Sequence, residues 1–246
     1  MGNMERYVAM AVAFSLGPAH LTWSPGEIDL PKRRSQVFLL GPSHFLPRHL
    51  EEAHIAFERT DTSKHCVSLA RREVDSMALE ALPIFHRCTW EIIQEAYQNY
   101  DHTVLLVPNW YFGNRYVQQL KTPQDLFLDL PLEAYNVVRE NVQPEHNEVM
   151  VRHGLSCLEC LTKSFPRLKL IFWCIARRTL IPNRTSSVPL EGQYLQVASR
   201  FPENTLDLLR HCDWETFTRQ HTKDNCGHPK RQGYELIFRL IDDIRG

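Results

Sequence analysis

A serine and a histidine that lie far apart in the chain have the surroundings that nucleophilic catalysis requires. Ser43 follows the apolar run 36–40 and the dipeptide Gly41-Pro42, so its hydroxyl is expected in a tight turn at the end of a buried strand. His228 lies in a polar segment near the C-terminus, four residues after Asp224. A serine hydroxyl is activated when an imidazole accepts its proton and a carboxylate orients that imidazole. The pattern predicts Ser43 as nucleophile, His228 as base and Asp224 as the orienting acid.

The segment after the apolar run 103–107 supplies candidate donors and a candidate binding surface. Gly113 and Asn114 offer a backbone N–H and a side-chain amide, which are good hydrogen-bond donors to an oxyanion. Trp110 and Tyr111 precede them, either as an aromatic platform for sugar rings or as part of the core.

Apolar runs that end at turn residues alternate with amphipathic stretches along most of the chain. The predicted strands are 36–40, 53–57, 103–107 and 168–175. The predicted helices are 74–82, 89–99, the segment from Asp129 to before Pro144, 145–165, 191–199 and 233–244. This alternation indicates an α/β fold with a mostly parallel sheet and helices on both faces. Because ligands bind beyond the carboxyl ends of such strands, residues 41–44, 109–114 and 176–178 are expected to line the site.

Three of these segments together resemble the SGNH (GDSL-like) hydrolase superfamily. That family has Gly-Asp-Ser near the start, Gly-x-Asn in the middle, and Asp-x-x-His-Pro followed by Gly-Tyr near the end. Here Gly41-Pro42-Ser43 and Gly113-Asn114 occupy the first two places. The segment from Asp224 to Pro229, followed by Gly233-Tyr234, occupies the third. Order, spacing and strand positions agree over about residues 36–244.

The resemblance implies a flavodoxin-like three-layer sandwich with a mostly parallel sheet. It divides the chain into an N-terminal extension at 1–35 and a hydrolase-like domain at 36–246. It implies an oxyanion hole made by the Ser43 N–H, the Gly113 N–H and the Asn114 amide. The implied reaction is ester hydrolysis or O-acyl transfer, on a small-molecule or glycan ester, without a metal or an organic cofactor. The oligomeric state stays open.

The sequence also departs from the family pattern. Pro42 stands where the family has aspartate, and Gly113 and Asn114 are adjacent rather than separated by one residue. Asp224 is four residues before His228, and Asn225 holds the usual position, so both are candidates for orienting the imidazole. These departures keep open a non-catalytic binding protein on a degenerate hydrolase fold.

A second resemblance gives a different chemistry. The segment Leu40–His44 is similar to the opening motif of Memo-like proteins, whose relatives are metal-dependent dioxygenases, and Cys226–Pro229 is similar to a late segment of that family. This resemblance implies His44 and His228 as metal ligands, and neutral imidazoles suit iron or copper.

Composition excludes some classes of protein. The chain has 246 residues, with 28 Lys and Arg against 29 Asp and Glu, a net charge of −1 that is not typical of a dedicated nucleic-acid binder. Seven irregularly spaced cysteines indicate free thiols in a reducing compartment, including the pair Cys157 and Cys160 on a predicted helix. Arg177 follows the strand predicted at 168–175, where it could meet an anionic substrate.

The apolar segment Tyr7–Leu16 bears on localisation. It is shorter than the roughly 20 residues that a membrane-spanning helix needs, so no transmembrane span is expected. The prediction is a cytoplasmic protein, with secretion as the alternative if this segment is a signal peptide.

Overall fold

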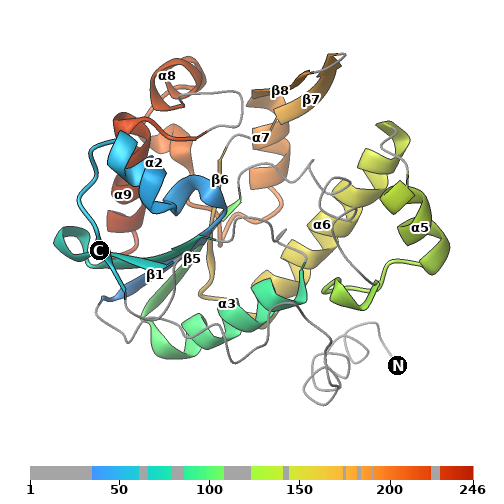
Figure 1. Ribbon diagram of the computed structural model, residues 1–246, viewed down its shortest axis with the longest axis horizontal. Coiled ribbons are helices and arrows are strands. Elements are labelled where there is room, and N and C mark those ends of the chain that lie inside the picture. The colour runs from blue at the N-terminus through green and yellow to red at the C-terminus, as the bar shows by residue number, and fades with distance from the viewer. Residues whose placement is uncertain are drawn as a thin grey trace.

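A six-stranded mixed sheet forms the centre of the molecule (Figure 1). The structure is a computed structural model that describes residues 35–60, 66–78, 86–107, 123–140, 144–173, 176–181, 184–189, 191–222 and 228–245. The strands are, in spatial order, β2 (Glu58–Arg59), β3 (Cys66–Leu69), β4 (Val74–Ala78), β1 (Val37–Gly41), β5 (His102–Val107) and β6 (Lys169–Phe172). Strands β4, β1, β5 and β6 pair in parallel, and β2 and β3 extend the β4 side in antiparallel pairing. The chain therefore has an α/β fold with a mostly parallel sheet.

Helices connect and flank these strands. The α-helices are α2 (Pro47–Glu52), α3 (Arg87–Asn99), α5 (Leu132–Glu140), α6 (Pro144–Ser164), α7 (Glu191–Ala198), α8 (Trp214–Thr216) and α9 (Arg231–Asp242). Shorter turns are η3 (Ser43–Phe45), η4 (Ala70–Arg72), η6 (Pro123–Asp125), η7 (Leu208–Arg210) and the π-helical turn η8 (Phe217–His221). A separate antiparallel hairpin joins β7 (Ala176–Ile181) to β8 (Arg184–Pro189).

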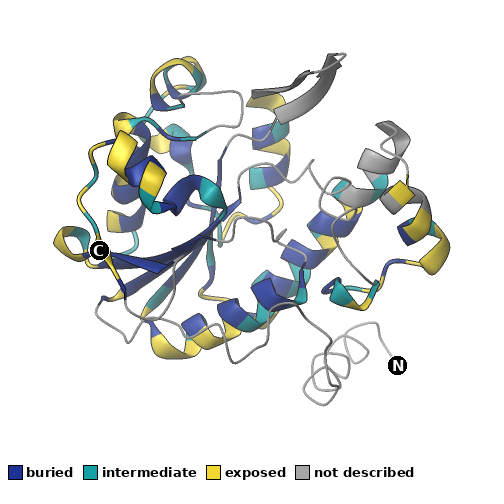
Figure 2. Ribbon diagram, in the orientation of Figure 1, coloured by how far each residue is buried: buried dark blue, intermediate teal, exposed yellow. Residues whose placement is uncertain are grey.

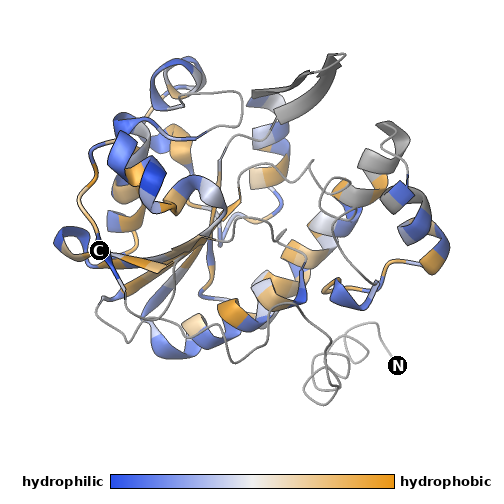
Figure 3. Ribbon diagram, viewed as in Figure 1, coloured by the Kyte–Doolittle hydropathy of each residue, from blue (hydrophilic) through white to orange (hydrophobic). Residues whose placement is uncertain are grey.

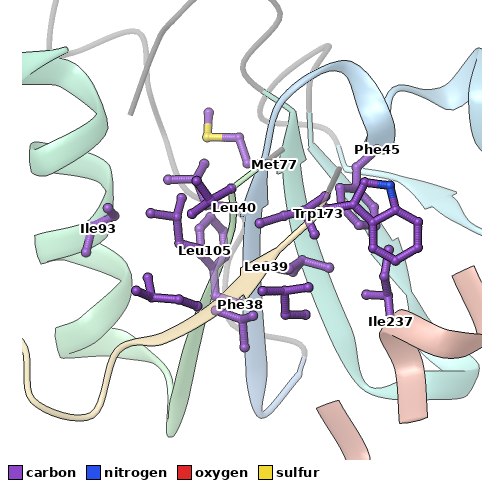
Figure 4. Close-up of a cluster of buried hydrophobic side chains, with 14 of the residues drawn as sticks. Phe38, Leu39, Leu40, Phe45, Met77, Ile93, Leu105, Trp173 and Ile237 are labelled. Carbon is purple, nitrogen blue, oxygen red and sulfur yellow. The ribbon is translucent and has the colours of Figure 1, made fainter. Parts of the chain in front are cut away.

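Core side chains pack on both faces of the central strand β1. Phe38, Leu39 and Leu40 are consecutive, so their side chains point to alternate faces, and all three are fully buried. Figure 4 shows Ile93 of α3 and Ile237 of α9 on opposite sides of the strands. The dark blue strands of Figure 2 are largely orange in Figure 3, and the helices carry apolar residues toward the sheet and polar residues away from it.

Several predicted elements are confirmed. The structure has strands and helices at the positions predicted from 36–40, 103–107, 145–165, 191–199 and 233–244. The strand predicted at 168–175 is shorter, because β6 ends at Phe172. The helix predicted between Asp129 and Pro144 is present as α5, which runs from Leu132 to Glu140.

The prediction of a helix at 74–82 is wrong, because Val74–Ala78 forms β4. Every residue of β4 is buried, as a strand inside a sheet requires, and so short an apolar run does not distinguish a strand from a buried helix. Asp75 helps to fix the strand, since its carboxylate accepts hydrogen bonds from Ser35 Oγ and Tyr100 OH, each at 3.2 Å.

The prediction of a strand at 53–57 is also wrong. Ala53 and His54 form the turn that ends α2, where His54 has a positive φ of 56°. Ile55 N–H then donates to Leu50 O at 2.9 Å and turns the chain back, so the strand starts only at Glu58. Residues 176–178, expected just beyond a strand and lining the site, lie in β7 of the hairpin.

Helix α3 begins two residues before the predicted Thr89, because His86 caps it. His86 Nδ1 accepts the backbone N–H of Cys88 at 3.1 Å, and burial lowers the pKa of His86 to about 4, although nearby Asp125 opposes the shift. Burial likewise lowers the pKa of His153 on α6 to about 4 against the opposing charge of Asp129. Both imidazoles are therefore neutral in the folded protein at neutral pH.

This burial predicts an acid-sensitive fold. The contribution of each neutral, buried imidazole to the free energy of unfolding is fully present above the unfolded pKa of 6.5. It is lost as the pH falls toward the folded pKa of about 4, because in this range only the unfolded chain takes up the proton. Within that window each histidine steepens the pH dependence of the unfolding free energy by up to about 1.4 kcal/mol per pH unit. His86→Asn keeps an N-cap acceptor without a titrating ring, so urea unfolding at several pH values should show a slope shallower by up to this amount. An unchanged slope would show that His86 does not carry the effect.

Candidate active site

The strand order places Ser43 where an α/β sheet offers a ligand crevice. Strand β1 lies between β4 and β5, so the chain adds strands first on one side of β1 and then on the other. Ligands bind at the carboxyl end of strands at such a reversal. Ser43 begins η3 directly beyond the carboxyl end of β1.

Close packing determines the course of the chain from β1 into η3. A Cβ on Gly41 would lie 3.0 Å from Phe45 Cδ2 and 3.3 Å from Leu106 Cβ, so the Phe45 ring packs directly on the glycine and would have to shift to admit a side chain. Leu46 N–H donates to Ser43 O at 3.1 Å and closes the turn. The small residue at position 41 thus allows Ser43 to lie tightly over the end of the sheet.

His228 is placed by the segment that leads into α9. Thr222 and Pro229 form an antiparallel bridge, and Lys230 N–H donates to His221 O at 2.9 Å. Gly233 lies against the same carbonyl, since a Cβ there would be only 2.3 Å from His221 O. Helix α9 therefore packs closely on η8, and residues 228–230, which lead into α9, are held against the end of η8.

The structure brings Ser43 and His228 together. Ser43 Oγ lies 3.1 Å from His228 Nε2, although 185 positions separate the two residues in the sequence. Both side chains are partly buried. A neutral imidazole with its proton on Nδ1 accepts the serine proton at Nε2, which is the arrangement that a general base requires.

Helix α9 also holds the Ser43 side of the pair. Tyr234 OH donates a hydrogen bond to the backbone carbonyl of His44, the residue after Ser43. Burial, with a smaller contribution from the charge of Glu52, raises the pKa of Tyr234 and keeps it a neutral donor. One helix thus positions both halves of the Ser43–His228 pair.

Two further histidines surround His228. The buried ring of His44 lies 5.0 Å from that of His228, centre to centre, at an interplanar angle of 38°. The buried ring of His49 on α2 stacks on His228 at 4.1 Å and 27°. His49 Nδ1 lies 3.6 Å from Glu52 Oε2.

The structure tests the other predicted site residues only in part. Asp224, Asn225, Gly113, Asn114, Trp110 and Tyr111 lie outside the described residues. Arg177 lies in β7 opposite Val188, and its side chain is also outside the described part. Their roles remain predictions.

The metal-site alternative receives limited support. His44 and His228 are neighbours, as it requires. Within the described ranges, however, no group of three or more His, Cys, Asp and Glu side chains is arranged to hold a metal ion. Cys157 and Cys160 lie on α6, and burial raises the pKa of both thiols, so both are neutral at neutral pH.

Sequence reasoning missed His49 and Glu52 as neighbours of the site. Pro47 was a usable signal for the helix that carries them, because proline is favoured in the first turn of a helix. Nothing in the local sequence indicates that this short helix turns its histidine toward a residue near the C-terminus.

Comparison with models of known protein families finds no match for this chain. Comparison with curated protein sequences also finds none. Among the described helices, none combines the length and the apolar character needed to cross a lipid bilayer.

Proposed function

We propose that this protein carries out serine-dependent acyl-ester chemistry, as an esterase or an O-acyltransferase. The observation that carries the proposal is the 3.1 Å contact between Ser43 Oγ and His228 Nε2 beyond the carboxyl end of β1. General-base assistance of this kind contributes about 10²–10⁴-fold to a reaction rate.

In the proposed reaction Ser43 Oγ attacks the carbonyl carbon of the ester, and its proton passes to His228 Nε2. The C–O bond to the alcohol then breaks, and His228 returns the proton to the departing oxygen. The acyl-serine reacts next with water or with an acceptor hydroxyl, which loses its proton to His228. Release of the carboxylic acid or the new ester regenerates both residues.

The remaining roles follow from the resemblance to SGNH hydrolases. Gly113, Asn114 and the Ser43 N–H would stabilise the oxyanion, and Asp224 or Asn225 would orient His228. The order β4-β1-β5-β6, with α3 and α9 on opposite sides, supports a flavodoxin-like three-layer sandwich. No step of this reaction calls for a metal or an organic cofactor.

We propose an ester of a carbohydrate or glycan as the substrate, by analogy with the family. Trp110 and Tyr111 would supply an aromatic surface for sugar rings, and Arg177 would meet an anionic substituent.

The cysteine content and the free thiols at Cys66, Cys88, Cys157, Cys160 and Cys212 support a cytoplasmic location.

The proposal predicts Ser43-dependent ester turnover. Release of 4-nitrophenol from 4-nitrophenyl acetate, and of acetate from acetylated monosaccharides, should fall at least about 10²-fold in Ser43→Ala. Ser199→Ala, which changes an exposed serine at the end of α7, should keep the wild-type rate. Adding a free sugar separates the two reactions, since a transferase would form a sugar ester. Equal rates in Ser43→Ala and wild type would overturn the proposal.

A further inference from the structure

We propose that His49 is a positioning residue that holds the His228 ring in the plane from which Nε2 reaches Ser43. The inference rests on the proposed function, because it assigns the support of the base in that reaction. The juxtaposition that carries it is the stack of the His49 ring on the His228 ring at 4.1 Å and 27°.

The His228 ring can rotate unless a neighbouring group packs against it. Rotation about its Cβ–Cγ bond moves Nε2 away from Ser43 Oγ, and rotation about an sp³–sp² bond has broad, shallow minima. A flat ring packed against one face of the imidazole opposes that rotation. The stacked His49 ring therefore helps to keep the 3.1 Å contact between Nε2 and Oγ.

His49 is itself held in place. Its side chain is buried, and Arg48 Nε donates to its Nε2 at 3.3 Å. With Nε2 accepting, the neutral ring carries its proton on Nδ1, which lies 3.6 Å from Glu52 Oε2. Leu50, between them on α2, is fully buried and anchors the helix to the core.

A positive charge forms on His228 during the proposed reaction. When His228 takes the serine proton it becomes an imidazolium, and a cation over the face of an aromatic ring is attracted by its π electrons. Glu52 lies beside the same stack and adds an opposite charge. The His49 ring thus stabilises one orientation of the His228 ring, both while His228 is neutral and after it has taken the serine proton.

The test compares flat and non-flat replacements at position 49. The second-order rate of reaction of Ser43 with a fluorophosphonate is measured for wild type, His49→Phe, His49→Leu and His49→Gln. We expect His49→Leu and His49→Gln to react about tenfold more slowly, equivalent to about 1.4 kcal/mol of activation free energy. His49→Phe, which restores a ring face, should react within about threefold of wild type. The exposed His54, changed to Asn to suit its positive φ, is the matched control and should leave the rate unchanged.

Thermal unfolding of each variant separates a positioning role of His49 from a purely structural one. A purely structural role would lower the melting temperature of the variants, and His49→Phe would not recover the rate at which Ser43 reacts with the fluorophosphonate. A wild-type rate in both non-aromatic variants, or a rate in His49→Phe as slow as theirs, would overturn the inference. The imidazole nitrogen NMR signals of His228 give a readout that does not depend on reactivity. If wild-type Ser43 does not react with the fluorophosphonate, the proposed function is rejected. If the His228 signals are the same in His49→Leu as in wild type, the role of His49 is rejected.

Discussion

Replacement of His228 by alanine is expected to slow the reaction of Ser43 with a fluorophosphonate by about 10²–10⁴-fold, the usual contribution of a general base. In this reaction Ser43 Oγ forms a bond to phosphorus, fluoride leaves, and the serine proton passes to His228 Nε2. Without the imidazole, the proton must go to water from a hydroxyl that is weakly acidic. The measurement is the time course of labelling at neutral pH, with Ser43→Ala as the fully unreactive reference.

The control for that prediction is a histidine with a polar partner elsewhere. His211 Nε2 contacts Asp243 Oδ2 at 2.8 Å, and His211→Gln removes this contact between two partly exposed side chains. It should label at the wild-type rate. If His228→Ala also labels at that rate while remaining folded, His228 is not the base and the contact with Ser43 is structural.

Replacement of Gly233 by alanine should damage both the fold and the site. The added Cβ would lie 2.3 Å from His221 O and 2.9 Å from Pro229 Cβ, and a backbone carbonyl cannot move aside as a flexible side chain can. Overpacking of this kind costs about 3 kcal/mol, which lowers the melting temperature of a chain this long by about 10 °C. Because His221 O also accepts the Lys230 N–H, displacement of η8 from α9 shifts the segment of His228, and labelling of Ser43 should fall with it.

Gly192→Ala is the matched control. Gly192 lies in α7 with nothing within 4 Å of an added Cβ, so alanine should stabilise the protein by up to about 1 kcal/mol through its higher helix propensity. Both variants are compared by thermal unfolding and by labelling. A Gly233→Ala protein with the melting temperature and labelling rate of the wild type would show that α9 does not constrain the site in this way.

The elements that could be predicted from sequence are those whose residue pattern fits only one type of secondary structure. Strands β1 and β5 are apolar runs closed by turn residues, and α9 carries apolar residues at helical spacing from Tyr234 to Ile241. Strand β4 could not be separated from a short helix, because pairing with β1 and β3 decides its conformation and that pairing is not visible locally. The hairpin β7–β8 was missed for a different reason: neither Ala176–Ile181 nor Arg184–Pro189 is a continuous apolar run of the kind that marks β1 and β5.

The residues of the candidate site also fall into those that could be predicted from their local sequence and those that could not. Ser43 and His228 were predicted because each has a local context that suits catalysis, and the sheet order then brings them within 3.1 Å. His49 has no such context, and its role depends on how α2 packs against a segment far along the chain. The predicted start of α3 at Thr89 is two residues late, because serine, threonine, asparagine and aspartate are the usual capping residues, whereas His86 caps the helix through a neutral ring nitrogen.

The central claim is that Ser43 is an activated nucleophile, and the most direct test is to map the fluorophosphonate adduct on the folded wild-type protein by mass spectrometry. We expect one adduct per chain, on the peptide that contains Ser43, and its loss in His228→Ala. Folded protein that carries no adduct on Ser43, or an equal adduct after His228 is removed, would contradict it.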